Sequence, residues 1–138
     1  MIIEVNSIEE TIDTARKFAE KLKPGDIIAL HGDIGVGKTV FVRGVVSYFG
    51  DETEVTSPTF SIMNIYCRNI YHFDLYRMED EEEIYEAGLD EYIFGDGISL
   101  IEWPDILGAH KNYDVTIEKN LDKGEDYRKI TVTGGEIL

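Results

Sequence analysis

The stretch that decides the fold of this 138-residue chain is Gly32-Asp33-Ile34-Gly35-Val36-Gly37-Lys38-Thr39. It fits the pattern G-x-x-x-x-G-K-[ST], which is typical of a phosphate-binding loop. The glycines let successive backbone N–H groups approach and point at one phosphate. Lys38 adds a positive charge for the β- and γ-phosphates, and the Thr39 hydroxyl is suited to ligate Mg²⁺. We therefore expect Asp33 to Thr39 to contact a nucleotide, with Lys38 exposed in the loop.

The sequence on both sides of this loop has the order strand, loop, helix that the motif requires. Residues 27–30 form a short apolar run rich in β-branched residues, as expected for a buried parallel strand. After the loop, apolar residues recur at helical spacing before Gly50, which is a typical helix end: Phe41, Val42, Val45, Val46 and Phe49. A chance glycine-rich turn does not explain this context, so we predict that the chain binds a nucleoside triphosphate.

The composition indicates a globular protein. With 138 residues, of which 43% are hydrophobic, the chain is expected to form one domain over residues 1–138. No apolar run approaches the length of a membrane-spanning helix, and Met1 to Val5 lacks the features of a signal peptide. Cys67 is the one cysteine, which excludes an internal disulfide and a cysteine-based metal cluster. We therefore expect a cytoplasmic protein without membrane contact.

The charge balance is strongly acidic. The chain has 13 Lys and Arg residues against 28 Asp and Glu residues, which gives a net charge of −15. Nucleic-acid binding draws much of its affinity from basic side chains that neutralise phosphates, and no Lys/Arg cluster is visible. The composition therefore argues against direct nucleic-acid binding and favours a basic protein partner.

The residues before the loop predict a strand and a helix. Residues 2–5 have the pattern of a short strand, and Ser7 with Glu10 forms a capping box at the start of a helix. This helix has an apolar face, which is expected to contain Ile8, Ile12, Ala15, Phe18, Ala19 and Leu22. Lys23 to Asp26 then ends the helix and turns the chain into the strand before the loop.

After the loop, the pattern predicts mainly strands. Residues 62–66 and 70–73 flank a short polar turn and are expected to pair as a hairpin. The acidic run Glu79 to Glu83 is expected at the start of a helix, where negative charge is favourable. Residues 98–101 are a candidate buried strand, and the segments around 115–117 and 130–132 are expected to pair with each other.

Two acidic residues are candidates for the second half of a nucleotide site. Asp74 and Glu102 each end a predicted strand, so both would lie at the carboxyl edge of a parallel sheet, where ligands bind. A P-loop needs an acidic residue there to hold Mg²⁺ directly or through water. His72 shares a strand face with Asp74, but no third metal ligand is evident, and we interpret it as a hydrogen-bonded strand histidine. No N-K-x-D motif is present, so ATP is expected rather than GTP.

Together these motifs resemble the TsaE family (also called YjeE), small bacterial P-loop ATPases required for threonylcarbamoyladenosine formation in tRNA. The matching segments, besides the loop, are Ser57-Pro58-Thr59-Phe60, His72-Phe73-Asp74-Leu75-Tyr76-Arg77, Glu102-Trp103-Pro104 and Arg128-Lys129-Ile130. They follow the order of the family over nearly the whole chain. Ile34, Val36 and Val40 depart from the usual family residues, but these changes remove no charged or ligating group.

The resemblance implies a fold and a biological role. The implied fold is a compact α/β sandwich, a single P-loop NTPase-like domain whose mostly parallel central sheet is flanked by helices and extended by antiparallel strands. The implied role is to join a threonylcarbamoyltransferase (TsaD-like) and its catalytically inactive homologue (TsaB-like), and to use ATP to support their cycles. The acidic composition agrees with a division of labour in which these partners handle the tRNA.

Carried over by position, the resemblance also implies roles for individual residues. Thr59 is expected to sense the γ-phosphate, and Trp103 is expected to pack beside the phosphate site. Asp74 and Glu102 are expected to act around Mg²⁺ and the attacking water. Besides the loop, the residues expected to contact the nucleotide are Ile8, Thr59, Trp103 and Arg128. The expected catalytic residues are Lys38, Asp74 and Glu102, and the expected metal ligands are Thr39, Asp74 and Glu102.

Two other functions are compatible with a P-loop. A small-molecule kinase would need a second substrate pocket and a lid that carries arginines, and no arginine-rich insertion is visible. A binding module that holds ATP without hydrolysing it would leave Asp74 and Glu102 without a role. Because little sequence is available to cover the site and no obvious arginine finger is present near the loop, we expect slow intrinsic hydrolysis that rises when partners bind.

Overall fold

The computed structural model describes residues 1–135 except residues 34, 51–61, 68, 77 and 109. Ile34 and the segment from Ser57 to Phe60, including Thr59, therefore lie outside the described residues. The strands are β1 (Ile2–Val5), β2 (Ile27–His31), β3 (Met63–Tyr66), β4 (Ile70–Asp74), β5 (Ile98–Glu102), β6 (Tyr113–Lys119) and β7 (Arg128–Gly134). The helices are α1 (Ile8–Ala19), α2 (Lys38–Tyr48), α3 (Glu81–Glu86) and α4 (Asp90–Ile93), with short 3₁₀ turns η1 (Pro104–Leu107) and η2 (Leu121–Lys123).

The described strands form one seven-stranded sheet in the order β1-β7-β6-β2-β5-β4-β3. The four central strands, β6, β2, β5 and β4, run parallel to one another. Antiparallel strands extend the sheet at both edges, with β3 beside β4 at one edge and β7 and β1 beyond β6 at the other. The α/β prediction, with a parallel centre and added antiparallel strands, is therefore confirmed.

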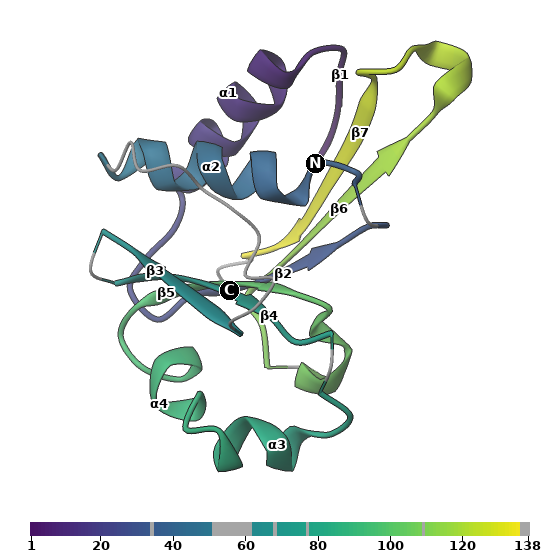
Figure 1. The fold of residues 1–138 in the computed structure, drawn as a ribbon. Helices are drawn as coiled ribbons and strands as arrows, with labels where there is room; N and C mark the ends of the chain where they lie inside the picture. Colours follow the sequence, from purple (N-terminus) through teal and green to yellow (C-terminus); the bar gives the residue numbers. More distant parts are fainter. Residues whose placement is uncertain (34, 51–61, 68, 77, 109, 136–138) are drawn as a thin grey trace.

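One hydrophobic core lies between the sheet and the pair α1 and α2, which cover the same face (Figure 1). Phe18 of α1 and Phe41 of α2 are buried side by side in this core, with ring centroids 5.6 Å apart. Gly44 of α2 allows the two helices to approach closely, because a Cβ atom there would lie only 2.5 Å from Cβ of Ala15. This contact positions α2, and with it the loop that precedes α2.

A second core lies on the opposite face of the sheet, beneath α3 and α4 (Figure 1). Ile84 and Ile93 bring these short helices onto Phe73 and Ile101, which alternate with residues of the first core along β4 and β5. Helices on both faces explain why β5 is buried along its whole length and β2 up to Leu30, and why both strands are mainly apolar rather than alternating. None of the described helices is long and apolar enough to cross a membrane.

The local predictions are confirmed except at the two ends of α1, which stops at Ala19, before Leu22. Ser7 caps this helix by accepting a hydrogen bond from the Glu10 N–H at 3.1 Å. The predicted hairpin is formed by β3 and β4, and the acidic run begins α3 with Asp80 as its N-cap. Ile8 was expected on the apolar face, but its side chain is 50% exposed. The physical reason is that Ile8 lies at the first turn of α1, where buried Thr11 rather than Ile8 faces the interior.

Candidate functional site

The loop from Gly32 to Gly37 connects the carboxyl end of β2 to the first residue of α2. Gly32 and Gly37 have φ angles of 144° and 111°, in the region that favours glycine. A Cβ atom on Gly32 would also lie 2.7 Å from the Ile117 carbonyl oxygen and from Val36 Cγ1. The backbone therefore requires glycine at these positions, and the free N–H groups at the start of α2 lie where an anion binds best.

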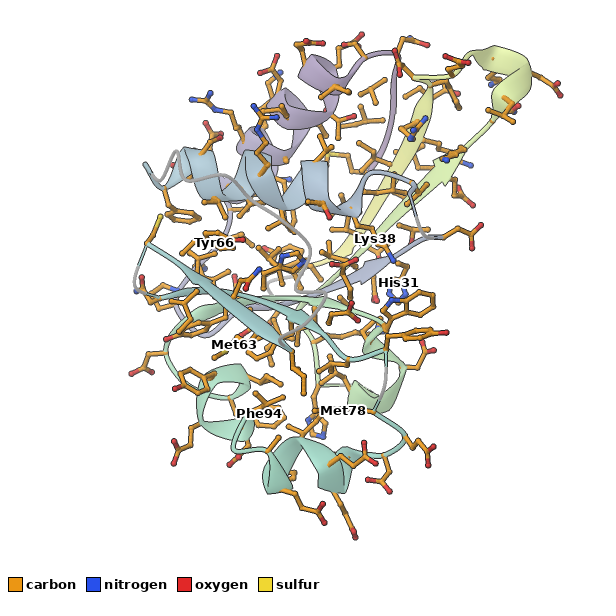
Figure 2. The ribbon with its side chains drawn as sticks, in the orientation of Figure 1. His31, Lys38, Met63, Tyr66, Met78 and Phe94 are labelled. Atoms are coloured by element: carbon orange, nitrogen blue, oxygen red, sulfur yellow. The ribbon has the colours of Figure 1, made fainter. Side chains whose placement is uncertain are left out.

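Lys38 is the first residue of α2, and its side chain is folded onto the loop. Figure 2 shows Lys38 at the same end of the molecule as His31, the last residue of β2. Its Nζ donates a hydrogen bond to the Gly32 carbonyl oxygen at 2.8 Å and lies 3.6 Å from Oε1 of Glu102. Lys38 was expected to be exposed, but its side chain is only 5% exposed, because Glu102 and the Trp103 ring cover its ammonium group.

Glu102 ends β5 and is buried, with 5% of the residue exposed. Its two carboxylate oxygens have different partners. Oε1 faces Lys38, and Oε2 lies 2.6 Å from Nε2 of His72, a fully buried residue of β4. The interpretation of His72 as a hydrogen-bonded strand histidine is confirmed. Glu102 is therefore held in place from both sides, by Lys38 from the loop and by His72 from the neighbouring strand.

Asp74 lies beside Glu102 at the carboxyl edge of the sheet. The two residues are register partners on the parallel strands β4 and β5, so both side chains leave the sheet on the same face. Asp74 is half-buried, and its Oδ1 accepts a hydrogen bond from the Tyr76 N–H at 3.0 Å. The structure thus brings Asp74, Glu102 and Lys38 to one end of the central strands.

Trp103 follows Glu102 and forms one side of this group. Its backbone is in the left-handed region with φ 57°, an uncommon conformation for a residue with a side chain. This turn places the indole ring 4.6 Å from Lys38 Nζ, a cation–π distance. The ring also packs against Tyr76, with centroids 5.0 Å apart. Trp103 therefore lies beside the phosphate-binding loop, where it was expected.

Two further cations lie on the other side of the loop, at the turn end of the β6–β7 hairpin. Arg128 Nε donates to the Val36 carbonyl oxygen at 2.7 Å, and Nη1 donates to the backbone carbonyl oxygens of Glu125 and Tyr127. Lys119 is the register partner of Arg128. A Cβ atom on Gly35 would lie 3.9 Å from Lys119 Nζ. Strand pairing thus brings Arg128 to the loop from a distant part of the sequence. Its contact with the nucleotide, which the family resemblance implies, stays a prediction.

A hollow of about 630 Å³ lies between the loop and the carboxyl end of β6. Its lining residues are Gly32, Asp33, Val36, Thr116, Ile117, Glu118 and Lys119. Ile8 lies at the same side of the molecule, since α1 begins shortly after Val5, the register partner of Arg128. The hollow and the two hairpin cations together offer space and positive charge next to the loop.

An ion-pair cluster around Asp114 lies next to the end of β2, directly before the loop. His31 Nε2 lies 2.7 Å from Oδ1 of Asp114, and Lys111 Nζ lies 2.8 Å from the same oxygen. Burial by itself would raise the pKa of Asp114, but the hydrogen bonds and positive charges of Lys111 and His31 outweigh burial and hold that pKa below its ordinary value. Asp114 thereby ties the end of β2, directly before Gly32, to β6.

The residues predicted to bind a metal all carry oxygen donors. Thr39, Asp74 and Glu102 supply hydroxyl and carboxylate oxygens, which are the donors that Mg²⁺ prefers. No group of three or more His, Cys, Asp or Glu side chains that could hold a metal occurs in the described part of the chain. This donor set fits Mg²⁺, which is usually held by one or two protein oxygens and completed by water and substrate phosphates.

The model of the family "Threonylcarbamoyl adenosine biosynthesis protein TsaE" matches residues 5–130. The chain belongs to the TsaE family. A tRNA threonylcarbamoyladenosine biosynthesis protein TsaE from Rickettsia bellii is 45% identical over 91% of this chain and 89% of that protein. The TsaE protein of Bacillus subtilis is 40% identical over 91% of this chain and 80% of that protein. A crystal structure of Bacillus subtilis YdiB superposes with a TM-score of 0.72, at 33% identity, over 97% of this chain and 84% of that one.

The TsaE resemblance inferred from the sequence is therefore confirmed, while the roles of single residues remain predictions. The structure brings together the loop, Lys38, Glu102, Asp74 and Trp103, and it places Arg128 on the other side of the loop. Two neighbours of the site were not predicted as site residues, His72 and Lys119. The period-two relation between His72 and Asp74 was a usable indication for the first. Lys119 has no local motif, and only the strand register reveals it.

Proposed function

We propose that this chain binds ATP with Mg²⁺ at the loop 32–39 and hydrolyses it in support of tRNA threonylcarbamoyladenosine formation. The proposal includes the division of roles expected from the sequence, in which the chain acts with a TsaD-like threonylcarbamoyltransferase and its inactive TsaB-like homologue. The chain itself works in the cytoplasm as a single ATPase domain and does not bind the tRNA directly. ATP hydrolysis is slow in the isolated chain and faster in the assembly.

The observation that best supports the proposal is the close contact between Lys38 and Glu102 at the end of a glycine-rich loop. A buried lysine 3.6 Å from a buried carboxylate places one group for phosphate charge and one for metal and water at a single point. An ordinary surface lysine would serve solubility and would not be covered by a carboxylate and an indole ring. The arrangement supports phosphoryl-transfer chemistry rather than a purely structural turn.

Each remaining residue has a defined task in this proposal. The Thr39 hydroxyl and the carboxylates of Glu102 and Asp74 would hold Mg²⁺, which when bound neutralises phosphate charge. Lys38 exchanges its contacts with Gly32 and Glu102 for the phosphates. Arg128 and Thr59 act at the nucleotide as the family resemblance implies. Glu102 orients the attacking water, because it is the buried carboxylate nearest to Lys38.

Slow hydrolysis by the isolated chain is expected because the Arg128 side chain is bound to backbone carbonyl oxygens. Arg128 donates to three backbone carbonyl oxygens, so its guanidinium group is largely occupied in holding the loop and the hairpin. No other arginine side chain of the described residues has a hydrogen bond to this loop. A partner that adds a cation or excludes water would therefore raise the rate, as added arginines do in related phosphoryl transfers.

The test combines nucleotide binding with phosphate release. ATP, GTP and a non-hydrolysable ATP analogue are titrated with and without Mg²⁺, and phosphate release is then measured for the chain alone and with the two partner proteins. We expect Mg²⁺-dependent ATP binding, slow release alone and faster release in the mixture. Binding without release under any condition would identify a nucleotide-dependent binding module. Transfer of the γ-phosphate to a small acceptor in place of water would identify a kinase.

A further inference from the structure

His72 is a polar residue that is completely buried inside the protein. It is 0% exposed and lies in the middle of β4, between Asn64 of β3 and Leu100 of β5. A polar ring in such a position costs free energy unless its nitrogen atoms find partners. Its Nε2 has one, Oε2 of Glu102 at 2.6 Å, whereas Nδ1 has no hydrogen-bond partner among the described residues. Within the part of the chain that the structure describes, the contact with Glu102 is therefore the one polar contact that accounts for the imidazole.

The direction of this hydrogen bond follows from the chemistry of the two groups. Glu102 faces the Lys38 ammonium through Oε1, and an ionised carboxylate can only accept hydrogen bonds. Nε2 of His72 must then carry the proton. In the neutral ring this leaves Nδ1 as an unprotonated acceptor. An acceptor of this kind is less costly to leave without a partner than a buried N–H group. Burial and hydrogen bonding thus select one tautomer of His72.

The two partners of Glu102 differ in how free they are to leave. Lys38 has a long flexible side chain. Its other contacts are a hydrogen bond to the Gly32 carbonyl oxygen and a cation–π contact with the Trp103 ring. His72 is fixed by the sheet, because its strand β4 is hydrogen-bonded to β5, the strand that carries Glu102. When Lys38 turns to a phosphate group, the His72 contact is the one that remains, among the described residues, to hold the Glu102 carboxylate in its present orientation.

We propose that His72 is a positioning residue that orients the Glu102 carboxylate and keeps Oε1 directed at the loop while Lys38 is engaged elsewhere. The effect of His72 on catalysis rests on the proposed ATPase function, but the orientation itself does not. Residues that hydrogen-bond a metal-site carboxylate typically change affinity or activity by about ten- to hundredfold when removed. His72 is expected to act in this range, and only through Glu102.

The first test needs no nucleotide. ¹H–¹⁵N NMR of the imidazole ring in the wild-type protein distinguishes a protonated from an unprotonated Nε2 at fixed pH. We expect His72 to be the tautomer with the proton on Nε2, and we expect Glu102→Ala to change the tautomer balance or the Nε2–H shift. A wild-type ring protonated on Nδ1 alone would overturn the proposal, and so would a ring unaffected by loss of Glu102.

The second test uses two amide substitutions that differ in reach. Nε2 of glutamine is separated from Cα by as many bonds as Nε2 of histidine, whereas Nδ2 of asparagine is one bond shorter. His72→Gln can therefore still donate to Glu102, and His72→Asn cannot. We expect His72→Asn to lower kcat by about tenfold or more with a smaller change in ATP affinity, and His72→Gln to restore most of that loss. Equal losses in both variants would indicate a packing role and would overturn the proposal.

A double substitution separates action through Glu102 from independent action. If His72 works only by orienting Glu102, adding His72→Asn to Glu102→Gln should change kcat by less than about twofold. A further tenfold loss in that background would show that His72 acts elsewhere and would overturn the proposal. If the wild-type chain hydrolyses no ATP at all, the proposed function fails, and the NMR test still decides whether His72 orients Glu102. The same NMR test decides the matter if His72→Asn does not fold.

Discussion

The Nζ atom of Lys38 lies 3.6 Å from Oε1 of Glu102, and both side chains are less than a tenth exposed. The lysine of the phosphate-binding loop is thus held by the carboxylate that stands opposite it. In water such a pair would contribute little, but buried charges depend on each other strongly, because removal of one leaves the other without compensation. This relation makes the two residues testable through stability as well as through activity.

We expect Lys38→Met to fold, to bind ATP at least about tenfold more weakly, and to unfold at lower urea concentration, because hydrogen bonds to charged groups contribute about 1.5–3 kcal/mol. Isothermal titration and urea unfolding measure the two effects. Adding Glu102→Gln should recover part of the stability, since the unpaired carboxylate is then gone. Lys17→Met, at an exposed position of α1, is the matched control and should change neither. Wild-type ATP affinity in Lys38→Met would contradict the loop assignment.

We expect Glu102→Gln to bind ATP as well as or more tightly than the wild type, because Lys38 is no longer attracted to a carboxylate. Phosphate release should fall by about a hundredfold or more, the range for loss of a group that assists proton transfer. Glu82→Gln makes the same change of charge at an exposed position of α3 and should leave the rate unaltered. If hydrolysis in Glu102→Gln is undiminished, the role of orienting water moves to Asp74.

The hairpin cations should affect nucleotide affinity to different degrees. Arg128→Ala removes the donor to Val36 O and should weaken ATP binding by about tenfold, because the loop loses a charged hydrogen bond. Lys119→Ala should weaken it by only a few-fold and reduce its salt dependence, since Lys119 is exposed. Lys123→Ala, on the same hairpin but paired with Glu4, is the control. Equal effects of Lys119→Ala and Lys123→Ala would exclude a local role for Lys119.

The Asp114 cluster should make stability depend on pH. The pKa of Asp114 is lowered in the folded protein, so its stabilising effect is present above the ordinary value of 3.8 and is lost as pH falls through the lower folded value. Asp114→Asn should therefore destabilise by about 1 kcal/mol near neutral pH, a low value for a charged hydrogen bond because these side chains are partly solvated. Urea unfolding across the acid range should show the two proteins converging below about pH 4. A difference that stays constant with pH would contradict this assignment.

Partner stimulation should weaken with salt. The chain carries a net charge of −15, so association with a basic partner surface is favoured at low ionic strength and screened over about 8 Å at physiological ionic strength. Phosphate release measured against partner concentration at low and high salt should show a shift in the half-maximal concentration with a smaller change in the maximal rate. If the isolated chain already releases phosphate as fast as the mixture, the chain is a self-sufficient ATPase.

The sequence predicted those features that depend on local pattern. The turn from β2 into α2, the N-cap at Ser7 and the hairpin of β3 and β4 each involve residues close in the chain, and each is found in the structure. Asp74 and Glu102 could also be matched, because both end apolar strands and parallel strands present their ends at one edge. These inferences need only the period of a strand and the geometry of a parallel sheet.

The remaining features depend on contacts between distant segments. His72 and Glu102 are 30 positions apart, and their contact depends on which strands are neighbours and in which register. Arg128 meets Val36 across 92 positions for the same reason. The burial of Lys38 depends on the left-handed turn at Trp103, a conformation that the residue type does not favour. No local pattern contains this information, so the sequence pattern left Lys38 exposed, and only the family resemblance implied that Arg128 lies near the nucleotide.

Trp103 is the one tryptophan of the chain, and its ring lies 4.6 Å from the Lys38 ammonium group and 5.0 Å from the Tyr76 ring. Indole fluorescence responds to charge and polarity beside the ring, so any movement of Lys38 changes the emission at its source. The molecule consequently contains an intrinsic optical reporter of its own loop. Binding of a ligand at the loop that moves Lys38 can be followed in real time without a label, and the signal comes from the single indole ring of Trp103.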